Sequence, residues 1–257
     1  MLLYLIVALL ATLLGSAAGM GGGVIITPMM NLLDDYNVVE ISVFASITVL
    51  SMAVFATIQQ LTKGFKITRV LIAVTAGSVL GGVLGSVMLS HLIARAGEDA
   101  VVAIQSLILF SLLLVCLFYH KIPHHHVKSP VLIGLIGLAL GLIGAYLGIG
   151  GGPINVAVLG IFMNLSLRRS ARASVFIILF SQVASVATKA VSGILTQVSD
   201  YSILAVMVPA AIIGGLAGAR LNRSVSDKGI VWMYRVSVIM VMLLCAYNLC
   251  AAAVGLL

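Results

Sequence analysis

Two glycine-rich segments hold the chemistry that stands out in this sequence. Residues Gly15-Ser-Ala-Ala-Gly-Met-Gly-Gly-Gly23 return as Gly144-Ala-Tyr-Leu-Gly-Ile-Gly-Gly-Gly152, each inside a long apolar stretch without a charged residue. Three consecutive glycines destabilise a helix and leave backbone N–H groups accessible, which lipid tolerates only where protein buries them or a cavity receives them. The main chain is therefore a candidate ligand for a substrate at six positions: Gly21, Gly22, Gly23, Gly150, Gly151 and Gly152.

A small anion is the ligand that such a main-chain site favours. Oxyanions need hydrogen-bond donors and a positive potential, and the N-terminus of a helix supplies both. Helices that begin near Val24 and Ile154, just after the glycines, would direct two N-termini towards the centre of the protein. Side chains beside the glycines or on the helices that follow add further donors: Thr27, Ser46, Asn155, Ser174, Gln182 and Lys189.

Each of these side chains also has a purely structural interpretation. A hydroxyl within a helix commonly bonds a carbonyl of its own helix, which leaves it no part in binding. Amides and amines are costly in lipid and should face protein or water, so Asn155, Gln182 and Lys189 are the stronger candidates. Lys189 lies about one turn before Gly193, where its side chain could instead extend to the membrane interface. The sequence leaves both positions of Lys189 open.

Acidic residues are missing from the apolar segments. All seven Asp and Glu residues lie in loops or at segment ends, so a carboxylate relay of the kind used by many proton-coupled carriers is not expected. One loop holds four histidines, but consecutive histidines cannot all converge on one metal ion: His120, His124, His125 and His126. We therefore expect no cofactor and no metal. An intramembrane enzyme would need a nucleophile with a base or a metal with acidic ligands, and is the weaker alternative.

Composition places the chain in a membrane. Hydrophobic residues make up 62% of the 257 residues and charged residues only 8%, a balance far outside that of soluble domains. We expect an all-α integral membrane protein in a lipid bilayer. The net charge of +7 lies mostly in loops, where Lys and Arg set topology, and no soluble basic domain exists to bind nucleic acid.

Charged or turn-rich breaks divide the chain into about eight hydrophobic segments. The first and fifth are too long for a single crossing, because some 32 residues at ~1.5 Å each would extend about 48 Å through a core of about 30 Å. Each must bend, and the glycines mark where. The segments are approximately 2–33, 38–61, 68–93, 100–119, 130–163, 173–195, 201–219 and 231–256.

Loop charge predicts the topology. The positive-inside rule places four basic loops in the cytoplasm: 62–69, 120–129, 164–172 and 220–230. The rule holds for all four only if the first and fifth segments are bent, glycine-broken helical hairpins that enter and leave on one side. The chain then consists of two inverted repeats, residues 1–128 and 129–257, with both termini outside.

A ridge of small residues recurs in both halves and strengthens the repeat. The spacing of four residues puts the members of each ridge on one helix face, where they allow a second helix to approach closely. We interpret these positions as packing surfaces: Gly77, Gly81 and Gly85 in the first half, and Ala210, Gly214 and Gly218 in the second.

The pattern resembles the TauE/SafE family, the sulfite exporter or sulfonate permease group. The resemblance rests on Gly19-Met-Gly-Gly-Gly-Val-Ile-Ile-Thr-Pro28 and Gly148-Ile-Gly-Gly-Gly-Pro153, each followed by a Ser-containing helix and a Gly-Gly-x-x-Gly helix. It covers essentially the whole chain. The second copy carries Asn155 where Ile26 stands in the first, so the two half-sites are not strictly equivalent.

The resemblance implies a membrane transporter for small sulfur-containing oxyanions, such as sulfite, sulfoacetate or related sulfonates. It implies a multi-pass protein of the bacterial cytoplasmic (inner) membrane, with export as the expected direction and the anion bound near the two triple-glycine breaks. Thiosulfate or a small carboxylate is the alternative substrate. The coupling ion and the oligomeric state stay open.

Overall fold

The structure is a computed structural model that describes residues 1–33, 35–118, 127 and 129–254. Within these ranges it consists of ten α-helices and one short 3-10 helix. In chain order they are α1 (Leu2–Ala18), α2 (Gly23–Leu33), α3 (Val38–Thr62), α4 (Arg69–Ala96), α5 (Glu98–Phe118), α6 (Pro130–Tyr146), α7 (Gly152–Met163), α8 (Leu167–Val191), η2 (Ile194–Gln197), α9 (Leu204–Ser224) and α10 (Asp227–Val254).

Six of the described helices are long and apolar enough to cross a membrane: α3, α4, α5, α8, α9 and α10. The helices α1, α2, α6 and α7 are apolar but shorter. Large apolar side chains such as Leu80, Ile213 and Leu243 are more than half exposed, and a surface of this kind requires lipid as its solvent. The chain is therefore an all-helical, multi-pass membrane protein, as its composition predicts.

Glycines divide each of the two longest apolar stretches into a pair of helices. The first glycine segment separates α1 from α2, and the second separates α6 from α7. Gly21 and Gly150 have φ angles of 66° and 74°, a left-handed conformation that residues with a side chain rarely adopt. Their amides donate back into the preceding helix, from Gly21 to Gly15 O at 3.2 Å and from Gly150 to Gly144 O at 3.0 Å. The two turns, which we call the first and second glycine breaks, share this hydrogen bond but differ at the next residue, because Gly151 has a φ angle of 78° and Gly22 has no positive φ.

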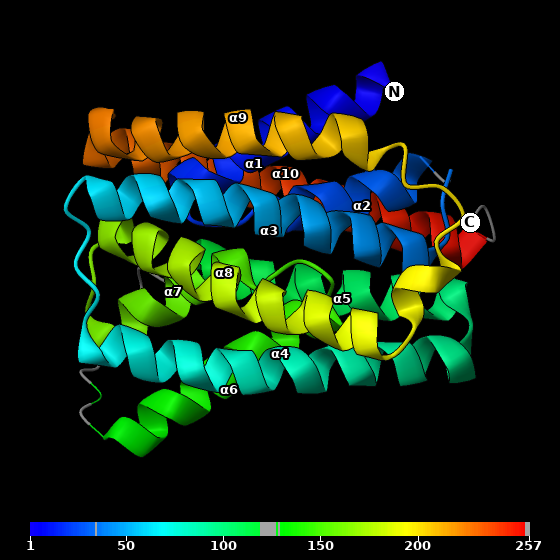
Figure 1. The fold of residues 1–257 in the computed structure, drawn as a ribbon, viewed down its shortest axis with the longest axis horizontal. Coiled ribbons are helices and arrows are strands. Elements are labelled where there is room, and N and C mark those ends of the chain that lie inside the picture. The colour runs from blue at the N-terminus through cyan, green and yellow to red at the C-terminus, as the bar shows by residue number, and fades with distance from the viewer. Residues whose placement is uncertain (34, 119–126, 128, 255–257) are drawn as a thin grey trace.

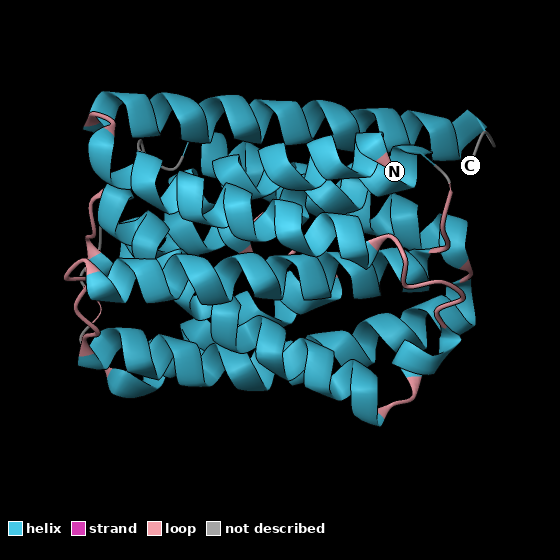
Figure 2. Ribbon diagram, turned by 45° about the horizontal axis from the view of Figure 1, so that its top comes forward, coloured by secondary structure: helices cyan, strands magenta, loops and turns pink. Residues whose placement is uncertain are grey.

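The two helix pairs extend into the bundle from opposite ends. In Figure 1, α1 and α2 have their outer ends on the right, where both chain termini lie, while α6 and α7 have theirs on the left. The helices α3, α7 and α9 end, and α4, α8 and α10 begin, at the left. Figure 2 shows loops gathered at these same two ends. The glycine breaks thus lie inside the bundle, away from both ends.

Small residues let the first helix of each pair pack closely on a neighbour. Helix α6 packs along α4, and α1 packs along α9. A Cβ added at Gly81 would lie 2.0 Å from Leu138 O, and one added at Gly214 would lie 2.6 Å from Leu9 O. Neither position has room for a side chain, so the glycine ridges are packing surfaces, as their spacing predicts.

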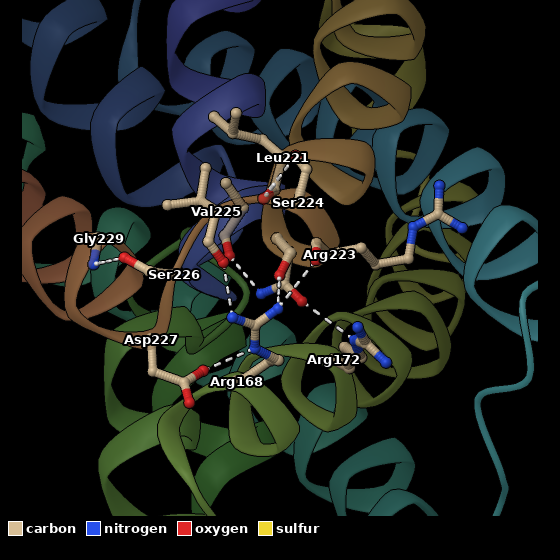
Figure 3. Close-up of polar contacts among 11 residues, drawn as sticks. Arg168, Arg172, Leu221, Arg223, Ser224, Val225, Ser226, Asp227 and Gly229 are labelled. Atoms are coloured by element: carbon tan, nitrogen blue, oxygen red, sulfur yellow. Dashed lines mark hydrogen bonds and ion pairs between the residues drawn. The ribbon is translucent and has the colours of Figure 1, made fainter.

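Arginines at the left end of the bundle belong to helices rather than to the loops that charge alone predicts. Helix α8 begins at Leu167, so the predicted loop 164–172 shortens to 164–166, and the predicted loop 220–230 shortens to 225–226. At Arg168 the reason is that the fold gives its charge partners, as Figure 3 shows. Its guanidinium donates to carbonyls at the end of α9 at 2.6 to 3.1 Å and pairs with Asp227 at 2.8 Å. Because its charge is bonded to another helix, Arg168 can lie inside α8, and the helix does not have to begin after it.

Candidate anion-binding site

The two glycine breaks pack directly against each other. A Cβ on Gly152 would lie 1.3 Å from the carbonyl oxygen of Met20, and a Cβ on Gly23 would lie 2.8 Å from that of Ile149. The contact is reciprocal, because each break sets a carbonyl beside the first residue of the helix that follows the other break. A side chain at Gly152 would overlap the opposite backbone. The structure thus brings the starts of α2 and α7 together, with a carbonyl oxygen beside each.

Two of the hydroxyls predicted to bind substrate hold these breaks. Ser174 Oγ donates to Gly19 O at 2.6 Å and to Gly152 O at 3.4 Å, so one side chain of α8 bonds both breaks. Thr27 Oγ1 donates to Gly148 O at 3.2 Å and joins α2 to the second break. Both donate to carbonyls outside their own helix, which opens the alternative that they position the breaks rather than touch a ligand.

Lys189 lies in the last turn of α8 and is buried in the protein. It is 3% exposed, and its Nζ donates to Ser42 O at 2.7 Å, to Ser42 Oγ at 2.8 Å and to Ser46 Oγ at 2.6 Å. Among the described residues the one ion pair joins Arg168 to Asp227, so Lys189 has no carboxylate partner there. A buried lysine bonded only to neutral oxygens has no counter-charge of its own, so its protonated form attracts an anion.

Ser42 is a residue that sequence reasoning missed. It lies one helical turn before Ser46 on the same face of α3, and that spacing was the only signal available. The partner that gives Ser42 its meaning is Lys189 on α8, which follows 147 residues later in the chain.

A pocket adjoins Lys189 at the end of the bundle that holds the chain termini. Its volume is about 290 Å³, and its walls come from the start of α3, the end of α4, the end of α8 and η2. Ser42 and Lys189 line it together with two further hydroxyls, Ser86 and Ser90. Ser42 Oγ also lies 3.8 Å from the position of a Cβ on Gly148. Ser42 therefore bonds Lys189, lines the pocket and lies near Gly148 of the second glycine break.

Two buried amides lie at the same break. Asn155 is 1% exposed, and neither its Nδ2 nor its Oδ1 has a hydrogen-bond partner among the described residues. Its Oδ1 lies 3.0 Å from the position of a Cβ on Gly151, and Gln182 Nε2 lies 2.8 Å from that of a Cβ on Gly150. An unpaired buried amide such as that of Asn155 costs stability, and a ligand or water at this point would satisfy it.

A different set of polar groups holds the first break. Asn222 Nδ2 donates to Ala17 O at 2.6 Å, just before that break, and Asn222 Oδ1 accepts from Arg172 Nε at 3.0 Å. Figure 3 shows Arg172 beside Arg168 at this end of the bundle. A Cβ on Gly19 would lie 2.2 Å from the Cα atom of Ala171, so backbone closes this side. Sequence reasoning used the arginines only as markers of topology and missed their bonds.

Metal binding finds no support in the described part of the chain. No group of three His, Cys, Asp or Glu residues there is close enough to hold an ion. The histidines 120 and 124–126 lie outside the described residues.

Glu40 caps α3, where it accepts from the Asn37 amide at 3.4 Å and from Ser199 at 2.9 and 3.0 Å. Outside the membrane-spanning helices, hydrogen bonds from Ser202 lower the pKa of the Asp200 carboxyl.

Six described helices long and apolar enough to cross a membrane define a polytopic membrane protein, which also contains two glycine-broken helix pairs and a buried lysine beside a pocket. A family model described as Sulfite exporter TauE/SafE matches residues 4–249, nearly the whole chain. The chain therefore belongs to the sulfite exporter TauE/SafE family, a family of membrane transporters. Searches of the curated proteins and of the solved structures found no match.

Proposed function

We propose that this protein exports a small sulfur-containing oxyanion, such as sulfite, sulfoacetate or a related sulfonate, across the bacterial cytoplasmic (inner) membrane. The observation that carries the proposal is Lys189, a buried ammonium without a carboxylate partner among the described residues, beside a pocket and the second glycine break. Burying an unpaired charge is expensive, and an anionic substrate supplies the missing counter-charge. The family membership supports the sulfur chemistry.

The anion in this proposal binds between Lys189 and the second break. Lys189 gives a charge-assisted hydrogen bond, and the hydroxyls of Ser42 and Ser46 turn from the ammonium to the anion. Asn155 and Gln182 donate amide hydrogens deeper in the pathway, next to Gly150, Gly151 and Gly152. At the first break Gly21, Gly22, Gly23, Thr27 and Ser174 hold the closing contact of the two breaks, which must separate for the anion to pass.

We also propose that residues 1–128 and 129–257 are inverted repeats whose first segments are glycine-broken hairpins. Paired contacts support this: Gly81 meets Leu138 as Gly214 meets Leu9, and Gly23 meets Ile149 as Gly152 meets Met20. Transporters built this way move one bundle against the other around a central site. With the basic loops in the cytoplasm, the pocket beside Lys189 faces outside.

Anion flux from proteoliposomes tests the proposed function. Sulfite, sulfoacetate, thiosulfate and a small carboxylate are compared, each with a pH gradient imposed and then collapsed. We expect flux of the sulfur oxyanions in the wild type and a loss of at least tenfold in Lys189→Gln, because a charge-assisted hydrogen bond disappears. The matched control is Arg95→Gln, which removes an exposed cation at the last turn of α4. Equal flux in both variants would contradict the proposal.

Cysteine labelling tests the topology. Single cysteines at Ser129 and Ser166, in a background without Cys116, Cys245 and Cys250, should react from the same side of the membrane. Reaction from opposite sides would exclude the hairpin arrangement.

A further inference from the structure

A second pocket lies at the opposite end of the bundle from Lys189. Its volume is about 550 Å³, and it lies between the connection of α3 to α4, the start of α4, the end of α7 and the start of α8. Three cationic side chains line it: Lys66, Arg169 and Arg172. None of the sequence-predicted site residues is among its lining residues.

The charge of this pocket is uncompensated within the described residues. The single ion pair there joins Arg168 to Asp227, and neither residue lines the pocket. The only hydrogen bond of the Arg172 side chain to a described residue goes from Nε to Asn222 Oδ1 at 3.0 Å, so its two terminal nitrogens stay available. Lys66 and Arg169 are exposed. Three cations converging on one pocket create a positive potential that attracts an anion.

Most of the remaining wall is apolar, and Thr68 adds one hydroxyl. Leu71, Leu159 and Met163 line the pocket together with Phe65, whose ring packs 6.4 Å from that of Phe176. The volume falls within the range of sites that hold organic molecules, about 300–1,000 Å³. An inorganic oxyanion little larger than a water, which takes about 30 Å³, would leave this wall uncovered.

We infer that this pocket binds an amphiphilic anion, with the anionic group at Lys66, Arg169 and Arg172 and an apolar body against Leu159 and Met163. Two sources share this chemistry: a free organic sulfonate and an acidic phospholipid. The first source rests on the proposed function, since it makes the pocket the cytoplasmic loading site for export. The binding of an amphiphilic anion at this pocket does not depend on the proposed function.

The pocket also adjoins the first glycine break. Ala173 lines it, and the next residue, Ser174, donates to Gly19 O. Arg172 reaches Asn222, which in turn bonds Ala17 O. An occupant that binds the guanidinium of Arg172 would draw it away from Asn222. Asn222 anchors the end of α1, so the occupant would act on the first glycine break.

Calorimetric titration of the full-length protein in phosphatidylcholine nanodiscs tests the inference. Ethane-, butane- and hexanesulfonate are compared with sulfite, and empty nanodiscs correct for partitioning. We expect the affinity to rise by about fourfold for each methylene that the wall buries. A second preparation contains phosphatidylglycerol, which should compete with the sulfonates if a phospholipid occupies the same site.

Charge variants locate the binding. Lys66→Gln and Arg169→Gln should each weaken hexanesulfonate about threefold to fivefold, the scale of an exposed charge interaction. The matched control is Lys63→Gln, which removes an exposed cation from the same connection but does not line the pocket. Val70→Phe narrows the apolar wall and should weaken hexanesulfonate more than ethanesulfonate.

Each outcome decides. Sulfonate affinity that grows with chain length and falls in the two pocket variants supports a free organic anion. Absent sulfonate binding, together with phosphatidylglycerol retention that falls in the same variants, supports a phospholipid. An affinity independent of chain length, or unchanged in both variants, overturns the inference. Lys189→Gln should leave this binding intact while it lowers flux at least tenfold, so failure of the proposed function is a separate result.

Discussion

The two glycine breaks share a left-handed glycine that bonds back to the preceding helix, but their chemical surroundings differ. Gly21 and Gly150 turn the chain in the same way. Around the second break lie the amides of Asn155 and Gln182, whereas the nearest side-chain atom to a Cβ on Gly21 is the Cδ1 of Ile178, at 3.0 Å. The chain thus has two similar turns with different polar groups around them, Asn155 and Gln182 at the second break and Asn222 at the first. If Lys189 binds the anion, as we propose, the two ends of the pathway differ in their affinity for it.

The buried positions behind the breaks show the same asymmetry. The offset that relates Gly23 to Gly152 also relates Gln60 to Lys189 and the pair Ser42 and Ser46 to Ala171 and Val175. Lys189 therefore has hydroxyl partners, while Gln60 is 4% exposed with no hydrogen-bond partner for its amide among the described residues. Four predictions follow the comparison from its strongest to its weakest consequence.

Substituting Gly152 by Ala should have the largest effect. The added Cβ would lie 1.3 Å from Met20 O, so the backbone of one break must move. We expect destabilisation above about 4 kcal/mol and little folded protein. Gly23→Ala, with 2.8 Å to Ile149 O, should be milder. Thermal unfolding in detergent measures the melting temperature of both variants. Melting temperatures equal to that of the wild type would show that the two breaks are not in tight contact.

Transferring the lysine from position 189 to the corresponding position 60 of the first repeat should not create an anion site there. Lys189→Gln should weaken anion binding about tenfold to hundredfold. Adding Gln60→Lys should not restore it, because Ala171 and Val175 cannot bond an ammonium as Ser42 and Ser46 do. Anion titration of the single and double variants checks this. Recovery of affinity in the double variant would mean that the two half-sites are interchangeable.

Asn222→Ala should destabilise the first break without touching the second. It removes the bond to Ala17 O at 2.6 Å and the acceptor of Arg172 Nε, and we expect a loss of about 1–3 kcal/mol. Denaturant unfolding measures the loss. Anion affinity at Lys189 is the internal control and should stay unchanged; a parallel loss of affinity would couple the two breaks energetically.

Asn155→Ile should have the smallest effect on folding. It gives the second break the residue that stands at the corresponding position of the first, Ile26. The amide has no partner among the described residues, so its removal should leave the free energy of unfolding unchanged or raise it by up to about 1 kcal/mol. Flux should fall. A clear loss of stability would assign Asn155 a structural bond instead of a ligand.

Local rules were enough for the class of fold and for the breaks. Hydrophobic runs predict membrane helices because lipid requires every backbone group to bond internally, and triple glycines predict interruptions because they weaken a helix. The glycine ridges were predictable for the same reason, since four-residue spacing fixes a helix face without reference to any partner. The start of α8 before Arg168 could not be predicted from local rules, because the partners of the Arg168 guanidinium lie at the end of α9 and the start of α10.

The amino-acid sequence by itself determined that the chain lies in a membrane, that it is helical, that it is broken twice by glycine and that its candidate polar groups include Lys189. Only the tertiary structure decided where those groups meet. Lys189 and Ser42 lie 147 residues apart, and Ser174 and Gly19 lie 155 apart. Contacts of that separation depend on how helices pack side by side, which composition and periodicity do not encode. The same packing placed a carbonyl beside the start of each helix that follows a break. It also brought three cations together in one pocket, although the sequence analysis had used these cations only as markers of topology.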